Sequence, residues 1–477
     1  MNFKAYFLCL TLFFGWITTT HAKVLLPQIL SSNMILQRDK PLNIWGYGNP
    51  GENVSVRFAT QQKTAVTDAR GNWKVVLSPL KTSAVPATMT IKGTNTILLK
   101  NILVGEVWLC SGQSNMEYAM HKLKTMKKPL NEKLGFPANE VANAHNKLIR
   151  IFVVNRKDLA KPDTNPKNWN IAKDPALKNS SAAGYFFAKE LQKQLRVPVG
   201  MITSAVSGSA IEPWIPAAIL AGPDFQGQYL GSDPGKFYPS MIEPLMPFAI
   251  KGVIWYQGET NCFRRENITY SYKMKALIKS WRSGWKNPSM PFYYVQIAPF
   301  IYSKTMQNVE IEPEFWEGQA QVMRMPKTGM VVTTDLNDKI DELHPTYKWE
   351  VGRRLALWAL AKDYGKKIVY SGPMYKSVKF KGPTAELQFD HVGTGLKSSN
   401  GKALSDFTIA GADGRFVPAT ARISGTKVLV SAAAVKKPVA VRFGWTESAN
   451  PNLYNKNGLP ALPFRTDNPL IAQFNPI

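Results

Sequence analysis

The sequence of 477 residues contains little cysteine and little histidine, with three Cys and five His. So few cysteines exclude a disulfide framework, and no Cys–His cluster has the spacing of a zinc site. A disulfide between Cys110 and Cys262 stays an open alternative, because the sequence does not show how the two residues lie relative to each other. With 44% hydrophobic residues, the chain is expected to fold around buried apolar cores.

Acidic residues are also scarce, since 33 Asp and Glu face 59 Lys and Arg and leave a net charge of +26. The basic residues are scattered and form no patch with interleaved aromatic residues. We therefore expect no nucleic acid partner. A solvated basic surface is the simplest interpretation, and attraction to an acidic glycan or an anionic surface is the alternative.

Long apolar runs are absent except near the start of the chain. Lys4 precedes an apolar run over residues 5–17, and the small residues of Thr20-His21-Ala22 follow. This layout predicts a signal peptide over residues 1–22 and a secreted or periplasmic protein, with an uncleaved anchor helix as the alternative. No later run is long enough to span a bilayer, so we expect no stable membrane insertion after cleavage.

Two parts of the chain have the pattern of β-domains. Short β-rich runs separated by turn residues predict an N-terminal β-sandwich-like domain over residues 23–103 and a C-terminal β-rich domain over residues 367–477. The runs lie at residues 41–45, 54–58, 73–77, 89–91, 385–389, 427–430 and 439–443.

Between them, residues 104–366 alternate apolar strands with helical periods. Helical spacing of apolar residues is clear over 270–281 and 351–358. This pattern predicts an α/β domain with a parallel sheet covered on both faces, whose strand carboxyl ends share one edge. The expected strands are residues 106–110, 148–154, 199–203, 252–257, 292–296 and 330–334.

Polar segments follow these strands at the edge where open α/β sheets bind ligands. They are residues 112–115 (Gly-Gln-Ser-Asn), 257–261 (Gln-Gly-Glu-Thr-Asn), 341–345 (Asp-Glu-Leu-His-Pro) and, more weakly, 207–214. Ser114 is a candidate nucleophile. Met116 stands where the second glycine of a Gly-x-Ser-x-Gly elbow would be, which argues against the elbow-type hydrolases.

Acyl transfer needs a nucleophile, a base and a group that orients the base. Ser114 can attack, His344 can take its proton, and Asp341 lies three residues before His344, where a turn would bring the carboxylate to the ring. Taken singly, the serine is typical of a turn and the Asp–His pair of a surface. Their occurrence together at successive strand ends favours catalysis.

Oxyanion donors are expected at the same edge. The N–H groups of Ser114 and Gly208 can serve, together with the side-chain amide of Gln257 or Asn261. Glu259 is either a catalytic acid or a buried carboxylate that braces its loop, and Asn115 and Asn261 are further candidates for supporting the site. No metal or organic cofactor is needed for this chemistry.

These motifs together resemble the sialate O-acetylesterase family of the SGNH hydrolase superfamily. The matching segments are Trp108-Leu-Cys-Ser-Gly-Gln-Ser-Asn-Met-Glu117, Pro198-Val-Gly200 with Ser207-Gly-Ser209, Gly252-Val-Ile-Trp-Tyr-Gln-Gly-Glu-Thr-Asn261, and Asp341-Glu-Leu-His-Pro345.

The resemblance implies a flavodoxin-like SGNH hydrolase domain flanked by N-terminal and C-terminal β-rich domains. It implies acetyl-ester hydrolysis on carbohydrate, with Ser114 as nucleophile, His344 as base and Asp341 as its partner. The oxyanion role would fall to Ser114, Gly208 and Gln257. Two departures stand out: Ser207-Gly208 replaces a usual Gly-Gly pair, and Gln257-Gly-Glu259 takes the place of the superfamily's Gly-x-Asn-Asp block.

The function expected from the sequence is therefore a serine esterase that removes O-acetyl groups from a glycan, most simply from sialic acid, through an acetyl-enzyme. An acetylxylan or other polysaccharide esterase is one alternative, and a non-catalytic carbohydrate-binding protein is another. A glycosidase that uses Glu259 ranks lower because it leaves Ser114 and His344 without a role.

Overall fold

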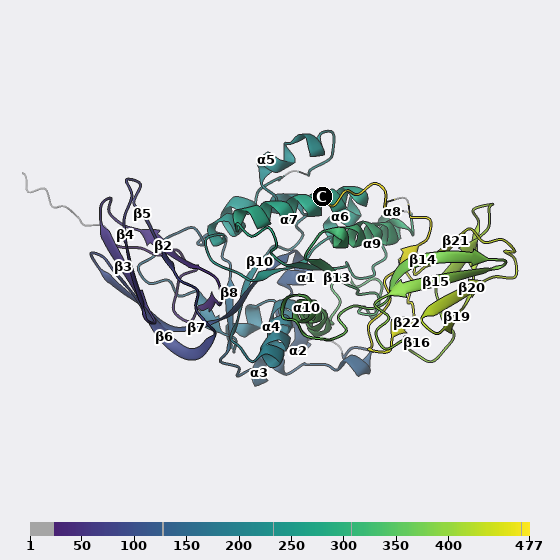
Figure 1. Cartoon of the computed structure of the whole chain (residues 1–477), viewed down its shortest axis with the longest axis horizontal. Coiled ribbons are helices and arrows are strands. Elements are labelled where there is room, and N and C mark those ends of the chain that lie inside the picture. The colour runs from purple at the N-terminus through teal and green to yellow at the C-terminus, as the bar shows by residue number, and fades with distance from the viewer. Residues whose placement is uncertain (1–22, 126–127, 232, 307, 469) are drawn as a thin grey trace, which may run out of the picture.

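The computed structural model describes residues 23–125, 128–231, 233–306, 308–468 and 470–477 (Figure 1). The predicted signal peptide, residues 1–22, lies outside the described residues. Within the described ranges, no helix combines the length and the apolar composition needed to cross a membrane.

A parallel sheet forms the centre of the chain, as the sequence predicts. Its order is β13-β12-β11-β7-β10-β8, and β9 pairs antiparallel with β8 at the edge. Without β8 and β9, this is the 2-1-3-4-5 order of flavodoxin-like sheets, with the topological switch at β7. The strands are β7 (Thr96–Gly112), β8 (Ile149–Val153), β9 (Trp169–Ile171), β10 (Val199–Ala205), β11 (Gly252–Tyr256), β12 (Phe292–Val295) and β13 (Thr328–Val331).

Long helices cover both faces of this sheet. Alternate residues of β11 enter two different cores: Val253 and Trp255 pack with α7 (Ile268–Gly284) and α9 (Ile311–Gln321), and Ile254 and Tyr256 pack with α4 (Ala182–Leu195) and α10 (Lys348–Asp363). All five residues of β11 are buried. Burial on both faces explains why the predicted strands are continuous apolar runs rather than alternating ones.

The N-terminal β-region joins the central sheet through one long strand. The first part of β7 pairs antiparallel with β6, and its last part lies between β10 and β11. The domain boundary that the sequence suggests at residues 103/104 therefore falls inside a continuous strand. The other strands are β1 (Ile35–Gln37), β2 (Leu42–Tyr47), β3 (Asn53–Phe58), β4 (Gln61–Val66), β5 (Asn72–Leu77) and β6 (Ser83–Lys92).

The C-terminal region is a second β-rich part at the opposite end of the molecule (Figure 1). Two four-stranded sheets, β14-β15-β20-β19 and β18-β17-β21-β23, enclose its core. The strands are β14 (Met374–Lys381), β15 (Thr384–Asp390), β16 (Leu396–Ser398), β17 (Phe407–Ala410), β18 (Phe416–Pro418), β19 (Thr420–Ser424), β20 (Lys427–Ser431), β21 (Ala440–Phe443), β22 (Leu453–Asn455) and β23 (Phe464–Arg465).

Short helices occupy the connections, mostly at the edge where the parallel strands end. They are α1 (Ser114–Glu117), α2 (Lys122–Thr125), α3 (Glu140–Asn143), α5 (Ala217–Leu220), α6 (Glu259–Phe263) and α8 (Ser303–Met306). Single turns are η1 (Glu132–Leu134), η2 (Leu177–Asn179), η3 (Glu212–Trp214), η4 (Pro223–Phe225), η5 (Tyr238–Ile242), η6 (Glu243–Leu245) and η7 (Val322–Arg324). The last parallel strand begins at residue 328 rather than at the predicted 330.

Candidate active site

Ser114 stands at the end of β7, in the middle of the sheet. Gly112 has a φ of +144°, and a Cβ there would lie 2.1 Å from the carbonyl oxygen of Tyr256, so the turn requires glycine. The N–H of Gln113 then donates to that same carbonyl at 3.0 Å. The end of β7 is therefore hydrogen-bonded to the end of β11. The next residue, Ser114, is half-buried and begins α1.

His344 meets this serine from a segment 230 residues away. Its Nε2 lies 2.9 Å from Ser114 Oγ, a hydrogen-bond distance between nucleophile and base. Burial, and then the positive charge of Lys348, lower the pKa of His344, while Glu342 opposes them. The ring is therefore held in its neutral form, which can accept the serine proton.

Asp341 does not reach the ring. Its side chain is exposed, and the hydrogen bonds and ion pairs of the described residues include none between Asp341 and His344. The predicted Asp341 contact is thus missing, and the neighbouring carboxylate of Glu342, also exposed, takes a main-chain contact with His344 instead. Glu342 Oε1 accepts the N–H of His344 at 3.0 Å.

Gly208 lies on the loop after β10, and Ala205 at the end of β10 is in register with Gly112. Gly208 has a φ of +70°, and open space lies where its Cβ would be. Glu117, at the end of α1, accepts the N–H of Ser207 at 2.7 Å and also its hydroxyl. One carboxylate therefore ties the Gly208 loop to the nucleophile helix.

The structure corrects the prediction that the side-chain amide of Gln257 or Asn261 donates to the oxyanion. Both residues are fully buried. Gln257 Nε2 donates to Asn261 Oδ1 at 2.7 Å, Gln113 Oε1 at 3.0 Å and the Ser209 carbonyl at 3.2 Å. Asn261 Nδ2 donates to Glu266 at 3.1 Å, and its Oδ1 also accepts the N–H of Ile211. Both amides hold the loops behind the site and have no donor left for a substrate.

Asn115 and Glu259 form a buried bridge behind Ser114. Asn115 Nδ2 donates to Glu259 Oε1 at 2.5 Å and to the carbonyl of Leu343 at 3.1 Å. Burial raises the pKa of Glu259, against the lowering effects of Asn115 and of Lys348. With 1% of its surface exposed, Glu259 fits the bracing role and not that of an acid in contact with substrate.

Three residues of the site were missed by the sequence interpretation. Gln113 Oε1 accepts from Gln257 and, at 3.2 Å, from the N–H of Gly258. Glu117 accepts the N–H of Ser207. Gln113 and Glu117 both lie within a motif that carries the family resemblance, so the sequence contained a signal for these two residues. Lys348 had no such signal, yet it is fully buried next to His344, and burial lowers its pKa to about 7.

The two cysteines within the described residues are not bonded to each other. Cys110 and Cys262 are free and buried, so the disulfide alternative is wrong in this structure. Burial raises the pKa of both thiols well above the ordinary value. In the described part of the chain, no group of three or more His, Cys, Asp or Glu is arranged to hold a metal ion.

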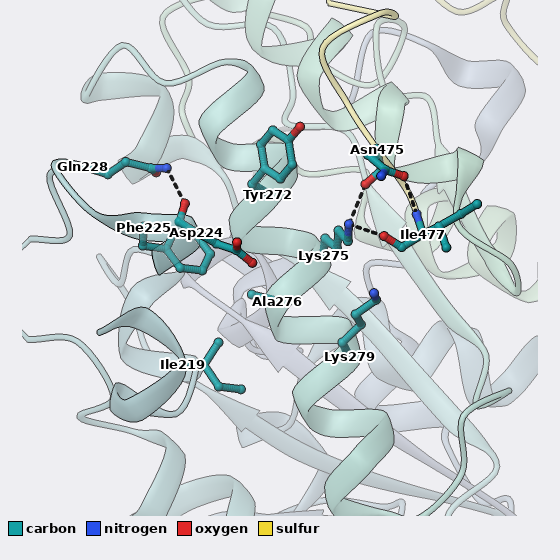
Figure 2. A pocket seen from close by; sticks show the side chains of 10 residues that line it. All are labelled: Ile219, Asp224, Phe225, Gln228, Tyr272, Lys275, Ala276, Lys279, Asn475 and Ile477. Carbon is teal, nitrogen blue, oxygen red and sulfur yellow. Dashed lines mark hydrogen bonds between the residues drawn. The ribbon is translucent and has the colours of Figure 1, made fainter. Parts of the chain in front are cut away.

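A cavity of about 610 Å³ lies apart from these residues, between α7, the η4 segment and the last residues of the chain (Figure 2). Lys275 projects into it from α7 and donates to the carbonyls of Asn475 at 2.7 Å and Ile477 at 2.6 Å. Ser114 and His344 are not among its lining residues.

A family model described as carbohydrate esterase, sialic acid-specific acetylesterase, matches residues 104–361, which is more than half of the chain. The chain belongs to this family of carbohydrate esterases. The matched segment runs from β7 into α10 and contains all the residues of the site described above.

Similar proteins extend the likeness beyond the matched segment. The chain is 28% identical to the human sialate O-acetylesterase, over 91% of each chain, and 26% identical to that of the mouse, over 91% of this chain and 93% of the relative. The crystal structure of a carbohydrate acetylesterase from Xanthomonas citri superposes with a TM-score of 0.83 at 37% identity, over 94% of this chain and 100% of that one. The chain is a carboxylic ester hydrolase with an SGNH-like α/β core.

Proposed function

We propose that this family member is a serine esterase that removes O-acetyl groups from sialic acid through an acetyl-enzyme. The observation that carries the proposal is the 2.9 Å contact between Ser114 Oγ and His344 Nε2. It joins a nucleophile to a neutral base at the topological switch of the sheet, where such folds bind ligands.

In the first step, Ser114 Oγ attacks the carbonyl carbon of the acetyl ester and its proton passes to His344 Nε2. The carbonyl oxygen becomes an oxyanion, for which the N–H groups of Ser114 and Gly208 are the proposed donors. The described main-chain hydrogen bonds give neither N–H an acceptor within the protein. The C–O bond to the sugar then breaks, and the departing sugar oxygen takes the proton from His344.

In the second step, His344 takes a proton from water, and the hydroxide oxygen bonds to the acetyl carbon. The tetrahedral intermediate collapses, acetate leaves, and the proton returns to Ser114 Oγ. Nε2 accepts a proton only when Nδ1 carries one. We retain Asp341 as the proposed acceptor of Nδ1–H, reached by rotation of its exposed side chain once substrate fills the site.

Sialic acid is the preferred substrate because the mammalian relatives are named sialate O-acetylesterases. The Xanthomonas structure, with a higher identity of 37%, is called a carbohydrate acetylesterase with no sugar named, so we keep an acetylated polysaccharide as a second candidate. Acetate release from O-acetylated sialoglycoconjugate and from acetylated xylan, measured side by side, distinguishes the two.

The catalytic assignment is tested by hydrolysis of an acetylated aryl ester. Ser114→Ala is expected to lower kcat by several orders of magnitude, because the nucleophile is lost. Ser283→Ala, on an exposed position of α7, is the matched control and should keep wild-type activity. Wild-type turnover by Ser114→Ala would refute the proposal.

The proposal also includes export of the protein from the cytoplasm. We propose that residues 1–22 are removed and that the mature enzyme begins at Lys23, outside the cytoplasm. N-terminal sequencing of protein recovered from the periplasm or medium tests this, and an intact Met1 in that fraction would contradict it.

A further inference from the structure

The main chain on both sides of His344 is held by two buried side chains from different elements. Asn115 Nδ2, from α1, donates to the carbonyl of Leu343 at 3.1 Å. Lys348 Nζ, from the first turn of α10, donates to the carbonyl of Pro345. The residue before His344 and the residue after it are therefore each fixed by a hydrogen bond.

Glu259 connects these two donors from the back of the site. Its Oε1 accepts from Asn115, and its negative charge acts on Lys348. All three side chains are buried, with at most 1% of their surface exposed. Such burial of a carboxylate and an ammonium costs free energy, so an apolar pair would serve stability better.

The surroundings of Lys348 partly offset the effect of burial, which favours loss of its proton. Nζ lies 4.9 Å from the ring centre of Tyr118 and 5.5 Å from that of Tyr256, so the faces of two rings stabilise the cation. Glu259 and Glu342 attract it, while Lys122 acts against it. The site thus holds Lys348 between carboxylates and aromatic rings, with its amine directed at the His344 segment.

We propose that Asn115, Glu259 and Lys348 form a positioning unit that fixes the main chain around His344 and so keeps its imidazole against Ser114. This inference rests on the proposed serine mechanism and adds three residues to it. The unit does through the backbone what a carboxylate on Nδ1 does through the ring. That explains how the 2.9 Å contact is present although Asp341 is exposed and makes no contact with the imidazole.

The test compares kcat, KM and pH profiles of folded variants on an acetylated aryl ester. Lys348→Met is expected to lower kcat about 10- to 100-fold with KM within about 2-fold, the scale of losses when a supporting partner is removed. Asn115→Ala should give a similar loss. Lys40→Met is the matched control, because Lys40 Nζ also donates to a main-chain carbonyl, that of Ile250, at 2.8 Å, ahead of β11 rather than beyond its end.

The pH profile separates positioning from mere folding. The charged groups acting on His344 are Lys348, Glu342 and Lys122. Removing the Lys348 charge should move the acid limb of kcat/KM to higher pH, whereas Asn115→Ala, which removes no charge, should leave it in place. A Lys348→Met enzyme with wild-type kcat and an unmoved acid limb would overturn the inference, as would a loss confined to Tm.

Failure of the proposed function looks different. If the wild-type enzyme does not need Ser114, the mechanism itself is wrong. If Ser114→Ala is inactive but Lys348→Met, Asn115→Ala and Lys40→Met all behave as wild type, only the positioning unit is wrong.

Discussion

The imidazole of His344 acts as a base only while it is neutral, so its surroundings set the pH range of the reaction. Burial and the positive charge of Lys348 disfavour protonation, and the carboxylate of Glu342 acts the other way. The balance holds the pKa of His344 below its ordinary value of 6.5. The residue is therefore ready as a base across the neutral range.

This environment predicts the acid limb of the pH profile. Because the lowered pKa keeps His344 neutral to lower pH, the acid limb of kcat/KM should be centred below pH 6.5, where the ring gains its proton. A kcat/KM profile on an uncharged acetyl ester, measured from acid to neutral pH, checks this. An acid limb centred above pH 6.5 would show that the ring is not in the environment described.

At the scale of elements, α1 acts as the junction of the site although it is only four residues long. Its Asn115 reaches the histidine segment, and its Glu117 reaches Ser207 on the loop after β10. Each contact joins the end of β7 to a loop that carries another part of the chemistry. Disturbing one contact should therefore affect one part of the reaction.

Glu117→Ala is the test of the second contact. Without the carboxylate, the Ser207–Gly208 loop loses its anchor, and we expect kcat to fall about 10-fold, less than the loss of an oxyanion donor itself. Steady-state kinetics with Glu386→Ala as control, a carboxylate of β15 in the C-terminal region, should show the difference. Equal kcat for the two variants would remove Gly208 from the proposed oxyanion site.

The same elements show which features the sequence could predict. Apolar runs and helical spacing were sufficient to predict the parallel strands. Polar residues at the strand ends were sufficient to predict that Ser114 and His344 lie together. Side-chain direction was not predictable. The side chain of Gln257 points inward because Gln113, Ser209 and Asn261 accept hydrogen bonds from its amide. These partners are distant in the sequence or belong to another turn, so the sequence does not show that they meet.

The geometry of the turn before His344 and the burial of Lys348 could not be predicted from the sequence either. An Asp-x-x-His spacing is compatible with several turns, and the one formed here directs Glu342, not Asp341, to the His344 N–H. Lys348 at the start of a helix gave no sign of burial, since lysines at such positions are mostly solvated.

At the scale of the whole molecule, the C-terminal β-region is bound to the catalytic domain by ion pairs. Arg465 donates to both oxygens of Glu317 on α9, at 3.1 and 2.7 Å, with 9% and 5% of their side chains exposed. Arg442 pairs with Glu310 at 2.7 Å, and Glu447 accepts the N–H of Ser303 at 2.9 Å. The two parts are thus joined by polar contacts that neither forms alone, and the Arg465–Glu317 pair among them is buried.

This junction predicts a large effect of one arginine. Arg465→Ala leaves the Glu317 carboxylate buried without its partner, which should lower the free energy of unfolding by about 3–5 kcal/mol. Lys376→Ala removes an exposed pair with Asp390 and should cost less than about 1 kcal/mol. Denaturant unfolding of both variants checks the contrast, and equal stabilities would mean that the junction contributes little.

Trapping the acetyl-enzyme tests the central claim most directly. Wild-type protein is quenched in acid during turnover of an acetyl ester, digested, and analysed by mass spectrometry. The mechanism predicts an acetyl group on Ser114 within the peptide that spans the end of β7, and no adduct in the Ser114→Ala variant. An acetyl group on another residue, formed equally in that variant, would contradict Ser114 as the nucleophile.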